Sequence, residues 1–236
     1  VLKQAFKRAK GTGILNVNPI SSWVCSQFIS GKVVVKPARL TAIDLPRIFA
    51  DLEQASVPLQ TLVLMMLLFG SRIGETRLTK WSDLDKRANF WRLRAENTKT
   101  KQAHRLPLTD IAWQVLNRHR RSLVGPAKRS GYLFAKRRDI KSPISAQYAS
   151  QRVSSLANQD WSAHDLRKLA RTQWLELGID YVIGEFLMNH QLRALDQAYI
   201  QTFADVKCIE ALTTWHRYLF DHGLGAFLSQ RQSEDS

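Results

Sequence analysis

Apolar residues recur every three to four positions through most of this chain, which is the spacing of one face of a helix. The run LVLMMLLF at residues 62–69 is apolar on all sides, so we expect it to lie in a core. It is far shorter than the roughly 20 residues that cross a bilayer, so no membrane span is expected. The pattern predicts helices over residues 2–10, 41–55, 58–69, 72–81, 110–122, 145–158, 163–177, 180–188, 194–200 and 206–220.

Residues 89–108 depart from the helical pattern. Phe90, Arg92 and Arg94 alternate with their neighbours, the polar stretch TKTK at residues 98–101 is typical of a turn, and HRLPL at residues 104–108 fits a returning strand. A β-hairpin is therefore predicted here. The expected fold class is mainly α with a small antiparallel β-sheet (α+β).

Pro, Ser and Gly steps without a sustained period predict a linker over residues 16–40. We expect residues 1–40 to hold the last helix of an upstream domain and this linker. Residues 41–228 are expected to form the main domain with a C-terminal docking helix, and residues 229–236 a disordered tail. The chain starts with Val1 and carries no signal peptide, which predicts an internal fragment of a cytoplasmic protein.

The net charge of the chain indicates what kind of partner it binds. Lys and Arg number 35 against 20 Asp and Glu, a formal net charge of +15, which favours a polyanionic partner such as nucleic acid. Cys25 and Cys208 are the two cysteines, far apart and outside any CxxC pair, so neither a disulfide framework nor a zinc site is expected.

A candidate phosphate site begins at residue 162. Ser162 and Asp165 form a capping-box pattern, which places His164 in the first turn of a helix and Arg167 one turn further on. A helix N-terminus with a histidine and an arginine favours phosphate. The alternative is a surface helix in which both residues are incidental.

Arg72 lies between two glycines directly after the buried helix. Its guanidinium is a planar donor fork that matches phosphate oxygens. The alternative is a buried ion pair with Glu75 or Asp83. At the expected hairpin tip, Lys99 could reach a phosphate or protonate a leaving oxygen, with Lys101 as its competitor and a solvated turn as the alternative.

Tyr199 follows His190 by nine residues in a polar helical stretch. A phenol with a pKa near 10 is a poor nucleophile at neutral pH, but nearby guanidinium groups would stabilise the phenolate for attack on phosphorus. The alternative is a tyrosine ring that packs into a helical interface.

In chain order these residues resemble the active-site set of the tyrosine recombinases, the phage-integrase family, and most of all the integrases of phages and genomic islands. The resemblance rests on FGSRIGE at 69–75, LTKWSDLD at 78–85, HDLRKLART at 164–172 and FLMNH at 186–190, and covers residues 41 to about 222. The implied catalytic set is Arg72, Lys99, His164, Arg167, His190 and Tyr199. Lys99 is chosen over Lys101 because the family's lysine precedes the proline of a Pro-Leu step by eight residues, and here that proline is Pro107.

The resemblance implies metal-free, cofactor-free DNA cleavage, in which Tyr199 becomes linked to the 3′-phosphate and a 5′-hydroxyl is freed. Arg72 and Arg167 would clamp the phosphate, with Glu75 and Asp83 orienting Arg72. His164 would accept the proton of Tyr199, while Lys99 and His190 would donate protons. No carboxylate cluster of the DxD or ExxK type that holds metal ions stands out in the sequence, which agrees with a site without metal.

Partners implied by the resemblance are double-stranded DNA at attachment sites, further copies of the chain in a DNA-bound tetramer, and an accessory DNA-bending or excision factor. Residues 206–220, apolar at Val206, Ile209, Leu212, Trp215 and Leu219, are the docking helix, with packing inside the chain as the alternative. Contacts to the DNA backbone are expected from Lys101, Arg118, Arg121, Lys136, Arg137 and Arg138. Alternative functions are a type IB topoisomerase, a dimer-resolving recombinase, a catalytically silent DNA-binding module, or a metal nuclease that EDTA would inactivate.

Overall fold

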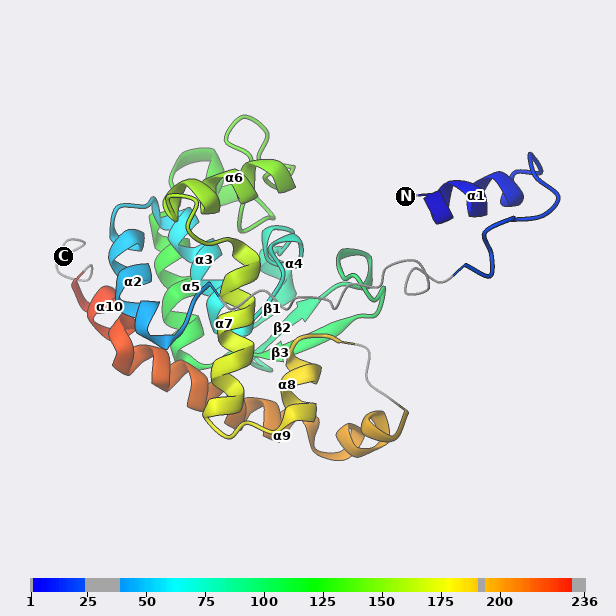
Figure 1. Cartoon of the computed structure of the whole chain (residues 1–236). Coiled ribbons are helices and arrows are strands. Elements are labelled where there is room, and N and C mark those ends of the chain that lie inside the picture. The colour runs from blue at the N-terminus through cyan, green and yellow to red at the C-terminus, as the bar shows by residue number, and fades with distance from the viewer. Residues whose placement is uncertain (1, 24–38, 191–193, 231–236) are drawn as a thin grey trace. The chain divides into compact units, whose positions relative to one another are not determined.

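The computed structural model describes residues 2–23, 39–190 and 194–230. At residues 194–203 and 230 it describes the backbone but not the side chains. The chain divides into two compact units, Val1–Pro37 and Ala38–Ser236. The first unit contains helix α1 (Leu2–Gly11), drawn blue in Figure 1, which buries none of its residues. The predicted linker lies mostly in residues 24–38, outside the described part of the chain.

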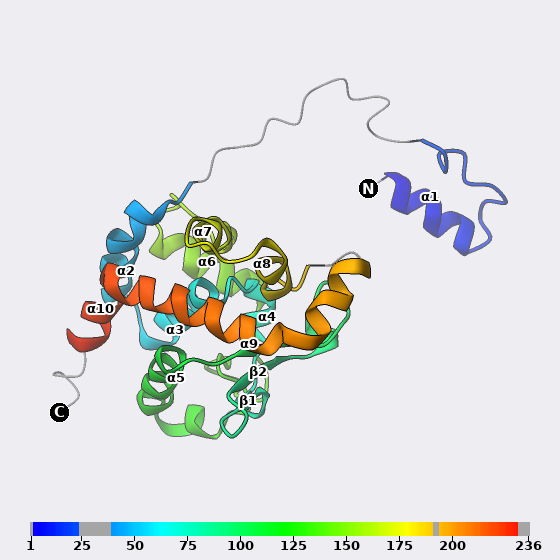
Figure 2. The same cartoon turned by 90° about the horizontal axis from the view of Figure 1, so that it is seen from below.

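The second unit is built around α3 (Val57–Phe69), whose residues from Leu59 to Phe69 are all buried. A helix that is apolar on all sides is stable only when other elements surround it. Helices α2 (Leu45–Glu53), α5 (Asp110–Ser122), α6 (Ala146–Leu156), α7 (Ala163–Glu176) and α9 (Ala194–Leu219) supply this cover (Figure 1). Viewed from below in Figure 2, α9 crosses the unit in front of α3.

Beside the helices lies an antiparallel sheet in the order β1 (Leu84–Asp85), β2 (Phe90–Leu93) and β3 (His104–Pro107). The predicted hairpin is confirmed, with Trp91 opposite Leu106 and Leu93 opposite His104. Residues 94–103 connect its strands and hold a 3-10 helix, Ala95–Asn97. Strand β1 was not predicted because two residues are too few to show a period. The mainly α fold with a small antiparallel sheet is thus confirmed.

Two predicted boundaries were wrong. Helix α4 (Ile73–Arg77) ends before Trp81, because the Asp83 carboxylate accepts the backbone N–H of Lys80 at 2.8 Å and begins a separate 3-10 helix, Trp81–Asp83. The helices expected at 194–200 and 206–220 form the single helix α9, which a kink within Phe220–Leu224 joins to α10 (Gly225–Gln230). The tail from residue 231 lies outside the described residues.

Helix α9 is attached to the C-terminal end of α3. The indole of Trp215 donates to the Leu67 carbonyl at 3.0 Å, and His216 Nε2 donates to the Leu68 carbonyl at 2.9 Å. These bonds satisfy carbonyls that the end of a helix leaves without partners.

The apolar face expected to dock on another protomer is buried in part within its own chain. Leu212, Trp215 and Leu219 are buried in the core of their own chain, while Val206 and Ile209 are exposed. The packing alternative therefore applies to these three residues, and docking through the two exposed residues stays a prediction. Among the described helices, none is long and apolar enough to cross a membrane.

We expect the free energy of unfolding to fall as the pH drops from about 6.5 to 4. Burial lowers the pKa of His216 from 6.5 to about 4, so the unfolded chain takes up this proton before the folded state does. The difference leaves stability unchanged above pH 6.5 and removes roughly 3 kcal/mol by pH 4. Urea unfolding at pH 7, 5.5 and 4 measures the loss.

The matched variant is His216→Gln, whose amide can still donate to the Leu68 carbonyl. Burial also lowers the pKa of His104 to about 4 and lowers the pKa values of His119 and His164, so His216→Gln should remove only part of the pH-dependent loss. An equal loss in the variant and the parent protein would contradict the assignment to His216.

Candidate active site

Arg72 immediately precedes α4 and is fixed by Glu75, one turn into the helix. The backbone N–H of Arg72 donates to Glu75 Oε2 at 3.0 Å, and its guanidinium Nη1 donates to Oε1 at 2.9 Å. Glu75 is buried, whereas the Arg72 side chain is 27% exposed. The ion pair that the sequence left as an alternative is therefore present, and it holds a partly exposed guanidinium in one orientation.

Asp83 does not share this role. Its carboxylate accepts from Arg94 Nε at 2.8 Å and from the Lys80 backbone, so the expectation that it orients Arg72 is corrected. The separate 3-10 helix at Trp81–Asp83 turns this carboxylate toward the sheet, where Arg94 follows β2.

Arg167, in the second turn of α7, is buried where two helices end. Its guanidinium donates to the carbonyl of Gly70, which follows α3, and to the carbonyl of Met188, at the end of α8 (Tyr181–Leu187). A cation at helix C-termini is favoured by the helix dipoles. Burial and the neighbouring Arg72 lower the pKa of Arg167 to about 10, which leaves it charged at neutral pH.

His190 bonds to Arg167 on one side and to a carboxylate on the other. Its Nε2 lies 2.9 Å from Arg167 Nη2, and its Nδ1 lies 2.7 Å from Glu185 Oε2. Because a guanidinium has no acceptor, Nε2 accepts and the proton lies on Nδ1. Burial raises the pKa of Glu185, but the bonds from His190 and Arg171 outweigh it and hold that pKa below its usual value.

His164 is exposed in the first turn of α7, where the Asp165 carboxylate accepts the N–H and hydroxyl of Ser162 at 2.9 and 2.7 Å. Partial burial, then Lys168, Arg167 and Arg72, lower the pKa of His164, while Asp165 opposes them. The imidazole is therefore neutral at physiological pH and available to accept a proton.

Lys99 and Tyr199 complete the predicted set. Lys99 is exposed in the connection between β2 and β3, and the hydroxyl of Thr100, the next residue, lies 3.4 Å from the amide oxygen of Asn189, beside His190. The ammonium of Lys101 instead donates to the Glu96 carbonyl within the connection. The backbone of Tyr199 belongs to α9, and its side chain lies outside the described residues.

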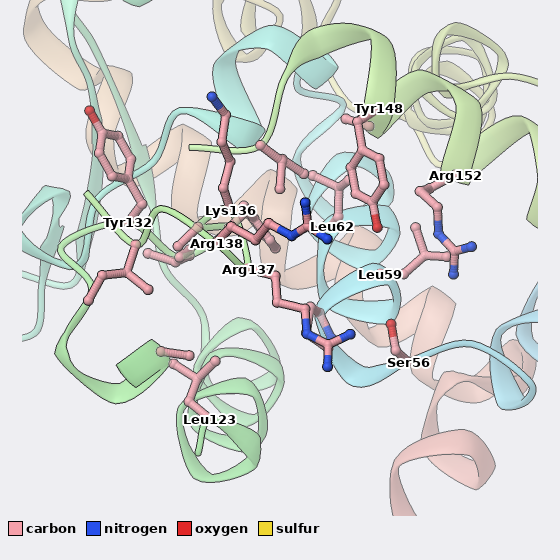
Figure 3. Close-up of a pocket in the computed structure, with 18 of the residues that line it drawn as sticks. Ser56, Leu59, Leu62, Leu123, Tyr132, Lys136, Arg137, Arg138, Tyr148 and Arg152 are labelled. Atoms are coloured by element: carbon pink, nitrogen blue, oxygen red, sulfur yellow. The ribbon is translucent and has the colours of Figure 1, made fainter. Parts of the chain in front are cut away.

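The residues expected to contact the DNA backbone do not form one cluster. Arg118 lies over the ring of Phe227, and Arg121 is exposed at the end of α5. Figure 3 shows the side chains of Lys136, Arg137 and Arg138 at a cavity of about 990 Å³, whose apolar wall includes Leu59 and Leu62. The cavity is further lined by Tyr132, Tyr148 and Arg152.

Several contributors to the site were missed from the sequence. The carbonyls of Gly70 and Met188 carry no sequence signal, because any residue has a carbonyl. Glu185 could have been found from its spacing, because it precedes His190 by five residues at the end of the same helix. Among the described residues, no group of three or more His, Cys, Asp or Glu could hold a metal ion.

We expect Gly70→Ala to lower the free energy of unfolding by about 2–4 kcal/mol. Gly70 has a φ of 56°, and an added Cβ would lie 2.8 Å from Met188 Cε and 3.1 Å from the Trp174 ring. Urea unfolding measures the change. The control is Gly131→Ala, where nothing lies within 4 Å of the added Cβ; similar losses in the two variants would contradict the prediction.

Comparison with known proteins gives concordant matches. The family model described as "Phage integrase family" matches residues 38–205. Prophage integrase IntA of Escherichia coli K12 is 24% identical over 190 residues, which cover 77% of this chain and 43% of IntA. The chain thus spans less than half the length of this curated relative.

Solved structures show the same fold. The integrase of mycobacterium phage Brujita is 21% identical with a TM-score of 0.61, covering 91% of this chain and 69% of its own. A lambda integrase dimer bound to a COC′ core site is 20% identical with a TM-score of 0.59, covering 82% and 70%. The Tn1549 transposon integrase in complex with a circular intermediate DNA is 17% identical with a TM-score of 0.61, covering 88% and 75%.

Proposed function

Because the chain belongs to the phage integrase family, we propose that it carries the catalytic domain of a site-specific tyrosine recombinase. This enzyme would cleave and rejoin double-stranded DNA through a 3′-phosphotyrosyl intermediate and so integrate or excise a mobile element. The observation that carries the proposal is the cluster of Arg72, Arg167, His164 and His190, in which two fixed guanidinium groups lie beside a neutral imidazole. Such a cluster fits a phosphodiester with a nucleophile beside it.

In the proposed first step, the Tyr199 oxygen bonds to phosphorus and the bond from phosphorus to the 5′-oxygen breaks. The phenol proton passes to neutral His164, and Lys99 supplies a proton to the departing 5′-oxygen. The 5′-hydroxyl of a partner strand reverses these transfers to rejoin the DNA. The phosphotyrosyl bond conserves the energy of the broken phosphodiester, so no nucleotide cofactor is required.

The two arginines would stabilise the charge that grows on the non-bridging oxygens in the transition state. Preorganised cations in a partly dry site are effective because they need little rearrangement during the reaction. Glu75 holds Arg72 from behind, and the Gly70 and Met188 carbonyls hold Arg167.

His190 has a conditional part in this scheme. Its Nε2 accepts from Arg167 in the DNA-free protein, so it donates to the phosphate only when doubly protonated. The Glu185 carboxylate at Nδ1 would balance the charge of that form.

We extend the proposal to the partners. The substrate would be double-stranded DNA at attachment sites, located at the nucleoid in the cytoplasm. On this DNA the chain would assemble as a tetramer, together with an accessory bending or excision factor. The lambda integrase tetramer bound to a Holliday junction, 20% identical with a TM-score of 0.59, has the same fold, and the net charge of +15 suits DNA.

The experiment that tests this function is covalent trapping in EDTA. The full chain is incubated with a pool of nicked duplexes of random sequence, denatured in SDS and separated from free DNA, and the bound DNA is sequenced. An adduct that survives SDS and EDTA supports the proposal, and its sequences reveal the site. Cleavage that EDTA abolishes, with no adduct, would replace the recombinase by a metal nuclease, and DNA binding without cleavage would indicate a silent module.

A further inference from the structure

The connection between β2 and β3, residues 94–103, is called here the lysine loop because Lys99 lies in it. The loop is partly held from within. The Thr98 hydroxyl bonds to the carbonyls of Ala95 and Gln102 at 3.1 and 2.9 Å, and the Lys101 ammonium reaches the Glu96 carbonyl at 3.2 Å. These bonds shape the loop but do not fix where it lies relative to the arginines.

Two contacts attach the lysine loop and its following strand to the end of α8. The His104 ring, at the start of β3, packs edge-on against Phe186 with ring centroids 5.0 Å apart. The Thr100 hydroxyl donates to the amide oxygen of Asn189 at 3.4 Å. The strand after the lysine loop therefore contacts the last turn of α8, and the loop itself contacts Asn189, two residues after that helix ends.

Asn189 is an unusual residue for its position. Its φ is 51°, in the left-handed region just after a helix where glycine is favoured. Its side chain is nevertheless present and buried, and its amide nitrogen has no hydrogen-bond partner. A buried unpaired donor is costly, so helix termination alone does not explain this side chain.

The position of Asn189 in the chain suggests its role. The preceding residue, Met188, supplies a carbonyl that holds Arg167, and the following residue, His190, bonds to the same guanidinium. A contact from Asn189 to the lysine loop therefore links Lys99 to the segment that holds Arg167.

We infer that His104 and Asn189 are positioning residues, which fix the lysine loop against the end of α8 and so place Lys99 relative to Arg167 and the scissile phosphate. This inference rests on the proposed function. It assigns to both residues an effect on the step that needs Lys99, protonation of the departing 5′-oxygen, and not on phosphate binding.

The first test compares two nicked substrates that differ in one atom. One carries the ordinary 5′-oxygen at the scissile phosphate and the other a bridging sulfur, which leaves without a proton because the pKa of a thiol is only about 8.5. Asn189→Gly, which retains the left-handed backbone, and Thr100→Val should each slow adduct formation about tenfold on the oxygen substrate and hardly at all on sulfur.

The controls separate positioning from general damage. Thr100→Ser, which keeps the hydroxyl, should restore the parent rate, and the Asn189→Gly, Thr100→Val double variant should be no slower than either single variant. Arg167→Lys should be slow on both substrates, because it affects the phosphate itself. Equal slowing of Asn189→Gly on oxygen and sulfur, or no slowing on either, would overturn the inference.

The second test does not depend on activity. Trypsin cleaves after Lys99 and Lys101, and we expect Asn189→Gly and His104→Phe to speed cleavage there several-fold without lowering Tm by more than a few degrees. Unchanged cleavage in both variants would overturn the attachment. If the parent protein forms no adduct on either substrate, the proposed function fails, and proteolysis still decides whether the loop is attached as described.

Discussion

Replacing Tyr199 by phenylalanine should abolish the SDS-resistant adduct and leave DNA binding intact. The substitution removes one oxygen, the proposed nucleophile, and no other side chain of the cluster can form a stable phosphoester under these conditions. Denaturing gels after trapping in EDTA measure the adduct, and a mobility-shift assay with the same duplex measures binding. We expect adduct below detection with unchanged affinity.

The other four tyrosines have surroundings that the structure describes. Tyr181 lies under Arg171, and Tyr218 stacks on Trp215 and His222. The Tyr132 ring lies under the Lys80 ammonium, and Tyr148 lines the cavity at α6 (Figure 3). Three of the four thus have ring contacts of their own, and Tyr199 stays the proposed nucleophile.

The matched control is Tyr218→Phe, which makes the same chemical change in the same helix. Its adduct yield should equal that of the parent chain. If Tyr199→Phe still formed an adduct, another tyrosine would be the nucleophile. Peptide mapping of the DNA-linked fragment would identify it.

Much of the fold could be predicted from the sequence because its signals are local. The all-apolar run before Phe69 predicted the buried α3, and alternation around Arg92 predicted the hairpin. The merging of two predicted helices into α9 was not predicted, because the few residues between them are too short to show a period of their own. Likewise, Leu212 and its apolar neighbours predicted a face, but not which partner covers it.

In the candidate site, too, the residues with local sequence signals could be predicted and the contacts that depend on the fold could not. His164 and Arg167 follow from a capping box, which is a local signal, and so does the pairing of Arg72 with Glu75. The assignment of Asp83 was wrong because its true partner, Arg94, is brought near by the pairing of β1 with β2, and β1 was not predicted. The contacts of Arg167 with Gly70 and Met188 join three elements distant in sequence, and only the folded chain reveals them.

Replacing Arg167 by lysine should slow adduct formation by about 10²- to 10³-fold, although the positive charge is retained. The guanidinium reaches the Gly70 carbonyl, the Met188 carbonyl and His190 Nε2 at the same time, which requires a planar fork. A lysine has one nitrogen on a flexible stem, so at least one buried carbonyl loses its partner and His190 loses its donor. Single-turnover trapping measures the rate.

The same change should lower the free energy of unfolding by about 1–3 kcal/mol, the usual penalty for an unpaired buried carbonyl. The control is Arg47→Lys, because Arg47 pairs with Asp44 and Asp160 at the surface, where ion pairs contribute little. A rate for Arg167→Lys close to that of Arg47→Lys would show that charge alone suffices at this position. Fork geometry would then have no part in catalysis, and the bonds that join α3, α7 and α8 at Arg167 would serve stability only.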